Sequence, residues 1–268
     1  MKIRIKFGKY GVMKFIGHLD MMRYFQKAMR RADIDIAYSE GFSPHQIMSF
    51  AAPLGVGITS EGEYLDIEVH TSRSSEASLK ALNEVMVEGV HVLEYKLLPE
   101  GTKNAMSSVV AADYTVAFKD ESNNPFTFQI LSGALEEFYH GQKEILITKQ
   151  TKKSEKVMDL KPLIYELKAI TLEDSSENIP VLAGERDKEC KEDAEKASVG
   201  FFLRVCTGST DNIKPELVLQ AFSDYCIGKG ICDYHFEPME LQVHRKEVYT
   251  KAEDGSFLPL GAAGQEIA

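Results

Sequence analysis

The chain has 268 residues, of which 44% are hydrophobic and 27% charged, and its formal net charge is −10. This composition is typical of a globular protein, and no apolar run approaches the roughly 18 residues that a membrane-spanning helix needs. Four scattered cysteines exclude a disulfide framework and offer no cysteine triad for an iron–sulfur cluster, so we predict a cytoplasmic protein without a cofactor and without a membrane partner.

The first hundred residues follow the order β-α-β-β-α-β. Alternation of Ile3, Ile5 and Phe7 with lysine and arginine predicts a half-buried strand at the start. Apolar residues three and four apart then predict a helix whose inner stripe is Leu19, Met22, Phe25, Met29 and Ala32. The predicted elements are a strand at 2–8, a helix at 17–32, strands at 34–38 and 63–70, a helix at 74–88 and a strand at 90–97. This order is that of the ferredoxin-like fold.

The same order repeats in the second half. Its predicted elements are a strand at 111–118, a helix from 124 to a stop at Gly141, strands at 144–149, 157–170 and 199–205, a helix at 215–226 and a strand at 240–248. We therefore predict an α+β protein made of two ferredoxin-like halves, packed as a tandem duplication. The halves are 1–100, with a long loop at 39–61, and 108–249, with an acidic insertion at 173–197. A frayed tail is predicted at 250–268.

The long loop and the helix predicted before it, at 17–32, form a candidate binding site. Residues 38–57, YSEGFSPHQIMSFAAPLGVG, combine three glycines, two prolines, three aromatic residues and a histidine. Loops on a rigid scaffold often carry function, and the apolar residues of this one argue against disorder. Residues 1–50 hold nine Lys/Arg against four Asp/Glu, so a local cationic face is expected on an acidic protein.

The candidate binding residues are those of the helix and the loop: His18, Asp20, Arg23, Lys27, Arg30, Arg31, Tyr38, Ser39, Gly41, Phe42, Ser43, Pro44 and His45. The four cations fall off the apolar stripe and can position phosphates, while Tyr38, Phe42 and Phe50 can stack unpaired bases. The structural alternative is that the cations are merely solvated, that the aromatics pack inward, and that Gly41 is needed for a positive φ.

Two further chemistries stay open. His18, Asp20, His45 and Glu63 are the residue types of general acid–base catalysis, although their spacing does not show that they meet. Cys226, Cys232 and His235 have a spacing that can contribute to a zinc site, but no second paired motif completes four ligands.

A family resemblance is carried by the segments GHLD, RYFQKAMRRADI, YSEGFSPHQIMSFAAPLGVG and GEYLDIEV, which lie between Gly17 and Val69. They resemble the radical-SAM-linked proteins, a bacterial family whose members occur as separate chains or fused behind a radical-SAM module. The matching positions are His18, Asp20, Tyr38, Ser39, Gly41, Phe42, Pro44, His45 and Gly55.

The resemblance implies a non-catalytic accessory or substrate-recognition module that works with a radical-SAM enzyme in trans. Together with the cationic helix and the aromatic loop, it predicts contact with RNA or with a ribonucleoprotein. One alternative is an RNA-modifying or RNA-cleaving enzyme with its site in residues 17–57. Another is a protein–protein scaffold.

Overall fold

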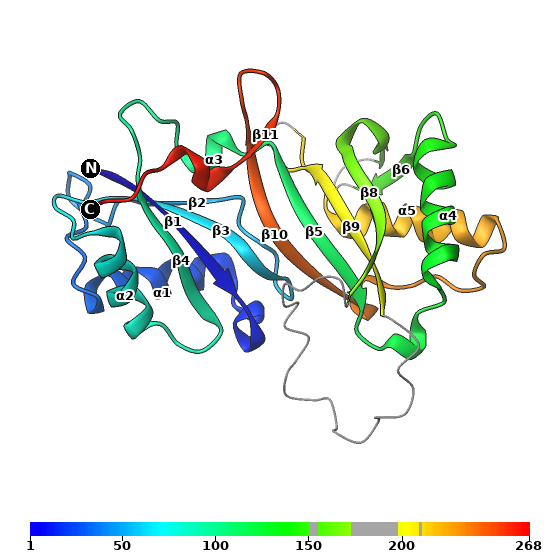
Figure 1. Cartoon of the computed structure of the whole chain (residues 1–268), viewed down its shortest axis with the longest axis horizontal. Coiled ribbons are helices and arrows are strands. Elements are labelled where there is room, and N and C mark those ends of the chain that lie inside the picture. Colours follow the sequence, from blue (N-terminus) through cyan, green and yellow to red (C-terminus); the bar gives the residue numbers. More distant parts are fainter. Residues whose placement is uncertain (151–154, 173–197, 209–210) are drawn as a thin grey trace. The chain divides into compact units, whose positions relative to one another are not determined.

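A computed structural model describes residues 1–150, 155–172, 198–208 and 211–268 (Figure 1). The chain divides into two compact units: unit 1 comprises Met1–Ala112 and Arg245–Ala268, and unit 2 comprises Asp113–His244. The predicted acidic insertion at 173–197 lies outside the described residues. Within them, no helix combines the length and the apolar character that crossing a membrane requires. Among the described residues, the main-sheet strands and the long helices of each unit follow the predicted β-α-β-β-α-β order, with a separate two-stranded sheet added in unit 2. The expected α+β class with two ferredoxin-like halves is therefore confirmed.

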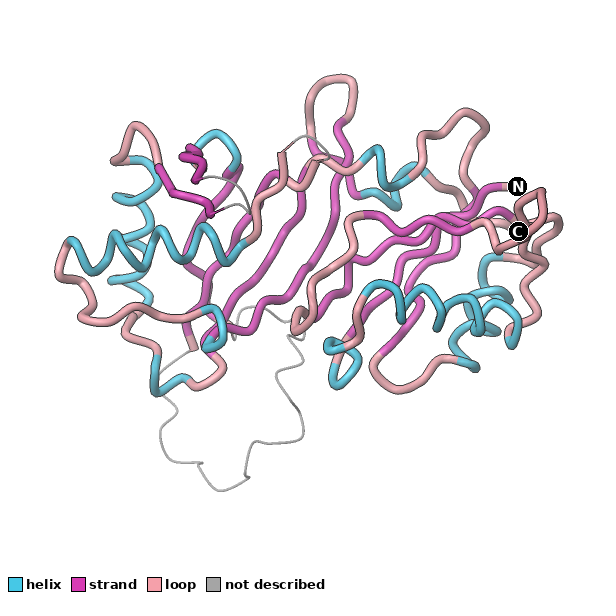
Figure 2. Tube along the Cα trace, turned by 180° about the vertical axis from the view of Figure 1, so that it is seen from behind, coloured by secondary structure: helices cyan, strands magenta, loops and turns pink. Residues whose placement is uncertain are grey.

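Unit 1 is built from six main elements. They are β1 (Lys2–Lys9), α1 (His18–Arg31), β2 (Met48–Ala51), β3 (Thr59–Glu68), α2 (Ser75–Val85) and β4 (Val90–Leu97). β1 lies between β4 and β3, and β2 pairs antiparallel with the other edge of β3, which gives the ferredoxin-like order. β10 (Leu241–Lys251) follows β3 in the strand order and pairs with β11 (Phe257–Pro259). The strands and both helices can be followed from behind in Figure 2.

The core of unit 1 lies between the sheet and its two helices. Ile3, Ile5 and Phe7 point from β1 toward this core, as their alternation predicts. The ring of Phe25 on α1 packs 4.6 Å from that of Phe7 and 5.7 Å from that of Phe50 on β2. These contacts fix which face of α1 is buried.

The predicted stripe of α1 is wrong at its first position. Leu19 is 62% exposed, whereas Met21, Phe25, Ala28 and Met29 are buried. Leu19 lies six residues before Phe25, which places it about 120° around a helix of 3.6 residues per turn. It therefore points away from the core that Phe25 enters.

The predicted strand at 34–38 is replaced by two isolated bridges, Ile36 to Val69 and Tyr38 to Gln46. The second strand of the unit is instead Met48–Ala51, inside the predicted loop. Phe50 explains the difference, because its burial against Phe7 and Phe25 anchors this segment beside β3. The described loop is consequently shorter than the predicted 39–61.

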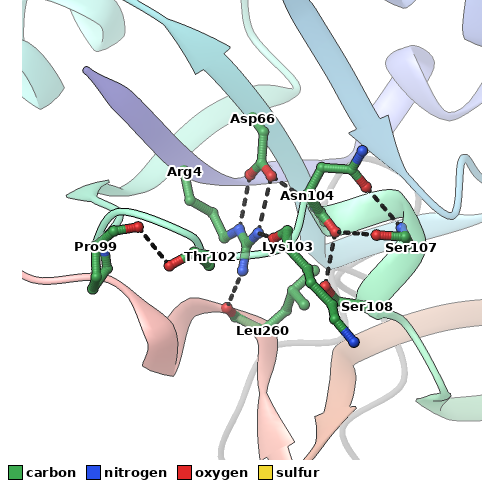
Figure 3. Close-up of polar contacts among 10 residues, drawn as sticks. Arg4, Asp66, Pro99, Thr102, Lys103, Asn104, Ser107, Ser108 and Leu260 are labelled. Atoms are coloured by element: carbon green, nitrogen blue, oxygen red, sulfur yellow. Dashed lines mark hydrogen bonds and ion pairs between the residues drawn. The ribbon is translucent and has the colours of Figure 1, made fainter.

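On the face of the unit 1 sheet opposite the helices, the chain's own segments cover Arg4 (Figure 3). Arg4 forms a two-bond pair with Asp66, Nε to Oδ1 at 2.8 Å and Nη2 to Oδ2 at 2.9 Å. Its Nη1 donates to the carbonyl oxygen of Leu260, and its Nη2 also to that of Lys103. The backbone N–H of Ala105, which begins α3 (Ala105–Ser108), donates to Asp66. Segments far apart in sequence therefore meet on one ion pair.

The predicted frayed tail is wrong. β10 continues to Lys251, β11 pairs with it, and Leu260 is fully buried. Leu97 and Gln265 exchange backbone hydrogen bonds, and Ile267 N–H donates to Ser75. Sequence periodicity missed this region because β11 has only three residues and the residues after it are held by partners more than 150 positions away.

Unit 2 repeats the arrangement. Its elements are β5 (Ala111–Phe118), α4 (Phe128–His140), β6 (Leu146–Gln150), β7 (Glu155–Asp159), β8 (Ile164–Thr171), β9 (Val199–Cys206) and α5 (Pro215–Gly228), followed by the start of β10. The strand order is β10-β5-β9-β8, and β6 and β7 form a separate two-stranded sheet. The predicted strand at 157–170 is interrupted because Pro162 lies in a 3-10 turn at Lys161–Leu163. α4 begins after Thr127, whose hydroxyl caps it, rather than at Asn124.

A second arginine–aspartate pair occupies the corresponding strands of unit 2. Arg204 on β9 donates Nε to Asp113 Oδ1 at 2.7 Å and Nη2 to Oδ2 at 2.8 Å. In unit 1 the arginine is on the first strand and the aspartate on the third, whereas in unit 2 they are exchanged. The central strand pair of each half thus carries the same kind of ionic link.

Breaking the link of unit 1 is predicted to destabilise the protein strongly. Asp66→Asn leaves the Arg4 charge buried without its partner, which costs about 3–5 kcal/mol of unfolding free energy. Asp20→Asn is the matched control, because Asp20 pairs with Arg23 on the exposed surface and should change stability by less than about 1 kcal/mol. Urea unfolding of both variants measures the difference, and equal midpoints would contradict this role of the Arg4 pair.

A glycine substitution tests the packing of β3. A Cβ on Gly62 would lie 2.7 Å from the backbone of Lys246 and Glu247, so Gly62→Ala should destabilise by roughly 1–3 kcal/mol. Gly133→Ala in α4 meets no atom within 4 Å and should instead stabilise by about 0.5–1 kcal/mol. Thermal unfolding should give shifts of opposite sign, and a neutral Gly62→Ala would disprove the close approach.

Candidate functional site

The segment from Tyr38 to Gln46, here called the aromatic loop, is closed at its base. Tyr38 and Gln46 form a β-bridge, and the Ser39 N–H donates to the His45 carbonyl oxygen at 2.9 Å. The His45 N–H donates back to the Ser39 hydroxyl at 3.1 Å, and this hydroxyl lies 2.8 Å from His45 Nδ1. Ser39 and His45 are therefore brought together as a clasp, a role the sequence did not reveal.

Phe42 occupies the tip of the aromatic loop, and its side chain is fully exposed. The turn before it uses Gly41 at φ +109°, a conformation that side-chain-bearing residues rarely adopt. Ser43, Pro44 and His45 are also exposed. The structural alternative, in which the loop aromatics pack inward, is wrong for Phe42 but correct for Phe50, which is buried and unable to stack a base.

The base of the aromatic loop is attached to α1 through Gln46. This buried side chain donates from Nε2 to the Gln26 carbonyl oxygen at 3.2 Å and to the Tyr38 hydroxyl at 3.4 Å. The same Gln26 carbonyl accepts a hydrogen bond from Arg30 Nε at 3.2 Å. Tyr38, which is half exposed, is therefore linked to α1 through Gln46.

The four cations of α1 are all exposed, but they differ in their contacts. Arg23, Lys27 and Arg30 follow one another at spacings of four and three, so they lie along one side of the helix. Arg23 is partly neutralised by Asp20, whose Oδ1 lies 3.1 Å from Nη1. Arg31 turns the other way and donates to the Val85 carbonyl oxygen at the end of α2.

The candidate catalytic residues are not assembled around one another. His18 places its ring 5.3 Å from that of Phe50, Asp20 pairs with Arg23, His45 with Ser39 and Glu63 with Arg245. The base of the aromatic loop is attached to α1 at Gln26. His18 lies eight residues before Gln26, which is about 12 Å along the axis of α1. The acid–base residues thus have four separate partners.

The cysteines of unit 2 do not form a zinc site in the described part of the chain. Burial raises the pKa of the Cys226 thiol to about 12, with a further contribution from Cys232. His235 pairs with Asp224 at 3.1 Å instead of facing the thiols. No group of three or more potential His, Cys, Asp or Glu ligands occurs among the described residues.

Sequence reasoning missed two sets of residues in this region. Gln26 and Gln46 attach the loop to the helix, but an isolated glutamine gives no local pattern. Lys9 and Arg245 are charged and almost fully buried, and both pair with Glu63, which the sequence suggested only as an acid–base candidate. Lysine or arginine on an alternating strand normally indicates the solvent side, so the pattern pointed the wrong way for these two cations.

Among solved structures, the chain is similar to the first two RRM domains of the yeast poly(U)-binding protein Pub1. It is 9% identical, the alignment covers 91% of this chain and 98% of that one, and the TM-score of 0.18 is too low to support an argument about this chain. No curated protein matches.

The model of one protein family matches residues 2–215, which is most of the chain. That family is described as an uncharacterized protein conserved in bacteria, DUF2344. The chain belongs to this bacterial family, DUF2344.

Proposed function

We propose that unit 1 is a non-catalytic module that binds a single-stranded segment of RNA with the aromatic loop and the adjacent side of α1. The observation that carries this proposal is the exposure of Phe42 at the tip of a closed loop. A large apolar ring held in water adds little to folding, whereas stacking of an unpaired base on such a ring contributes about 1–3 kcal/mol to binding.

The neighbourhood of Phe42 supports RNA over a purely apolar ligand. Tyr38 offers a second exposed ring, and Gln46 links it to the Gln26 carbonyl oxygen that also accepts from Arg30. Arg23, Lys27 and Arg30 are about 5–6 Å apart from one to the next along the helix, so they can neutralise successive phosphates. Rings for bases and cations for the backbone are the two components of single-strand recognition.

The net negative charge of the protein limits the surface to which RNA can bind. A net charge of −10 repels nucleic acid in general and confines attraction to the cationic side of α1. We therefore expect a short footprint of a few nucleotides with a modest salt dependence. A radical-SAM enzyme acting in trans is a proposal that rests only on the resemblance of residues 17–69.

The test is binding of fluorescently labelled single-stranded RNA, measured by anisotropy across a salt series. Phe42→Ala should weaken binding about 5- to 150-fold without changing the salt slope, because it removes stacking and not charge. Phe15→Ala is the matched control, since Phe15 is also an exposed phenylalanine and lies in the Gly11–Phe15 turn. Equal affinity of wild type and Phe42→Ala would remove the proposal.

The charges are tested in the same assay. Changing Arg23, Lys27 and Arg30 to alanine should lower the slope of log K against log salt by about 2, at roughly 0.7 for each phosphate contact. Arg31→Ala should leave the slope unchanged, because its guanidinium is turned toward α2. If wild type binds no RNA and Phe42 is needed to retain a protein partner instead, the scaffold alternative replaces this one.

A further inference from the structure

Three charged side chains are almost fully buried together in unit 1. The exposed fraction is 3% for Lys9, 4% for Glu63 and 1% for Arg245. Lys9 Nζ lies 4.0 Å from Glu63 Oε1, and Arg245 Nη2 lies 3.2 Å from Glu63 Oε2. Buried charges are costly unless they are paired, and here two cations share one carboxylate. The group is one negative charge short of balance.

The guanidinium of Arg245 also has unused donors. Its Nη1 donates to the Ala52 carbonyl oxygen at 2.6 Å. Its Nη2 is close to Glu63 but not aligned for a hydrogen bond, and its Nε has no acceptor among the described residues. Arginine cannot give up its proton in a protein, so the charge and the free N–H groups persist. A buried donor without an acceptor costs about as much as a lost hydrogen bond.

Lys9 shows the same shortage of negative charge. Burial lowers the pKa of its amine, Glu63 partly offsets this effect, and the neighbouring Arg245 lowers the pKa further. The distance of 4.0 Å to Glu63 is longer than a charge-assisted hydrogen bond. A second anion beside Lys9 would stabilise its protonated form.

The cluster is connected to the surface by the turn at 52–57. Ala52, whose carbonyl oxygen accepts from Arg245, has φ +41°, a strained conformation for a residue with a side chain. Pro53, Gly55 and Val56 are exposed, and the N–H of Gly57 donates to the Lys14 carbonyl oxygen. This turn is separated from the aromatic loop by β2, so the two features are independent.

We propose that Arg245 and Lys9 hold the oxyanion of a small ligand, a carboxylate or a phosphate group, which reaches them at the turn formed by residues 52–57. The oxyanion accepts from Arg245 Nε and Nη2 and from Lys9 Nζ, and it supplies the missing negative charge. Glu63 competes with the ligand for the same two cations. Removing the charge of Glu63 should therefore increase the affinity for the oxyanion, whereas removing either cation should decrease it.

Thermal unfolding of the whole chain tests the site, with phosphate, sulfate and acetate titrated against chloride at constant ionic strength. The wild-type melting temperature should rise and saturate with at least one oxyanion, since a ligand that binds only the folded state stabilises it. A response to acetate alone assigns a carboxylate ligand, and a response to phosphate and sulfate assigns a phosphate ligand.

Three substitutions should shift the apparent Kd for the oxyanion in known directions. Glu63→Gln removes the competing charge and should tighten the apparent Kd by about tenfold. Lys9→Met and Arg245→Met should weaken it by about tenfold or more, while Lys2→Met, which removes an exposed cation on β1, should leave it unchanged. If Arg245→Met does not fold, the opposite shifts of Glu63→Gln and Lys9→Met decide the matter.

Two results would overturn the proposal. One is a melting temperature that is the same in all four anions at matched ionic strength, both for wild type and for Glu63→Gln. The other is a saturable oxyanion response that Lys9→Met and Glu63→Gln leave unaltered, because the anion would then be bound elsewhere.

Discussion

The packing of Phe25 between Phe7 and Phe50 is the interaction on which the arrangement of unit 1 depends. It joins α1 to β1 and β2 through ring centroids 4.6 to 6.1 Å apart. Because it fixes the buried face of α1, it also fixes the side on which the cations meet water. Phe50 holds β2, and β2 separates the aromatic loop from the turn over the buried charges. One apolar cluster thus positions both sites that the structure suggests.

The centre of the unit 1 sheet face opposite the helices is buried around Arg4 and Tyr64. Ferredoxin-like RNA-binding modules such as the RRM stack bases on exposed aromatics of the sheet. In unit 1 that face carries the buried Arg4–Asp66 pair, and Tyr64 is buried with its hydroxyl donating to Glu247. The chain's own segments around Lys103 and Leu260 lie over Arg4 (Figure 3). RNA would therefore have to bind at a different surface from that of an RRM.

The sequence predicted local elements well and long-range partners poorly. The strands 90–97 and 111–118 match β4 and β5 because their apolar patterns are confined to one segment. Phe50, by contrast, was assigned to recognition because no local pattern shows that a loop residue packs against α1. The Ser39–His45 clasp, the link from Gln46 to α1 and the buried Arg245 each depend on residues that only folding brings together. For the same reason, the sequence indicated which residue types belong to the candidate site but not which of them lie next to one another.

The proposed contact of RNA with the aromatic loop and α1 can be located directly. Ultraviolet cross-linking of a short single-stranded RNA containing 4-thiouridine, followed by mass spectrometry of the digested protein, locates this contact. Cross-links within Tyr38–His45, accompanied by cross-links to the exposed side of α1, are the predicted result. Cross-links confined to unit 2 or to other segments of unit 1, with none in the aromatic loop, would contradict it.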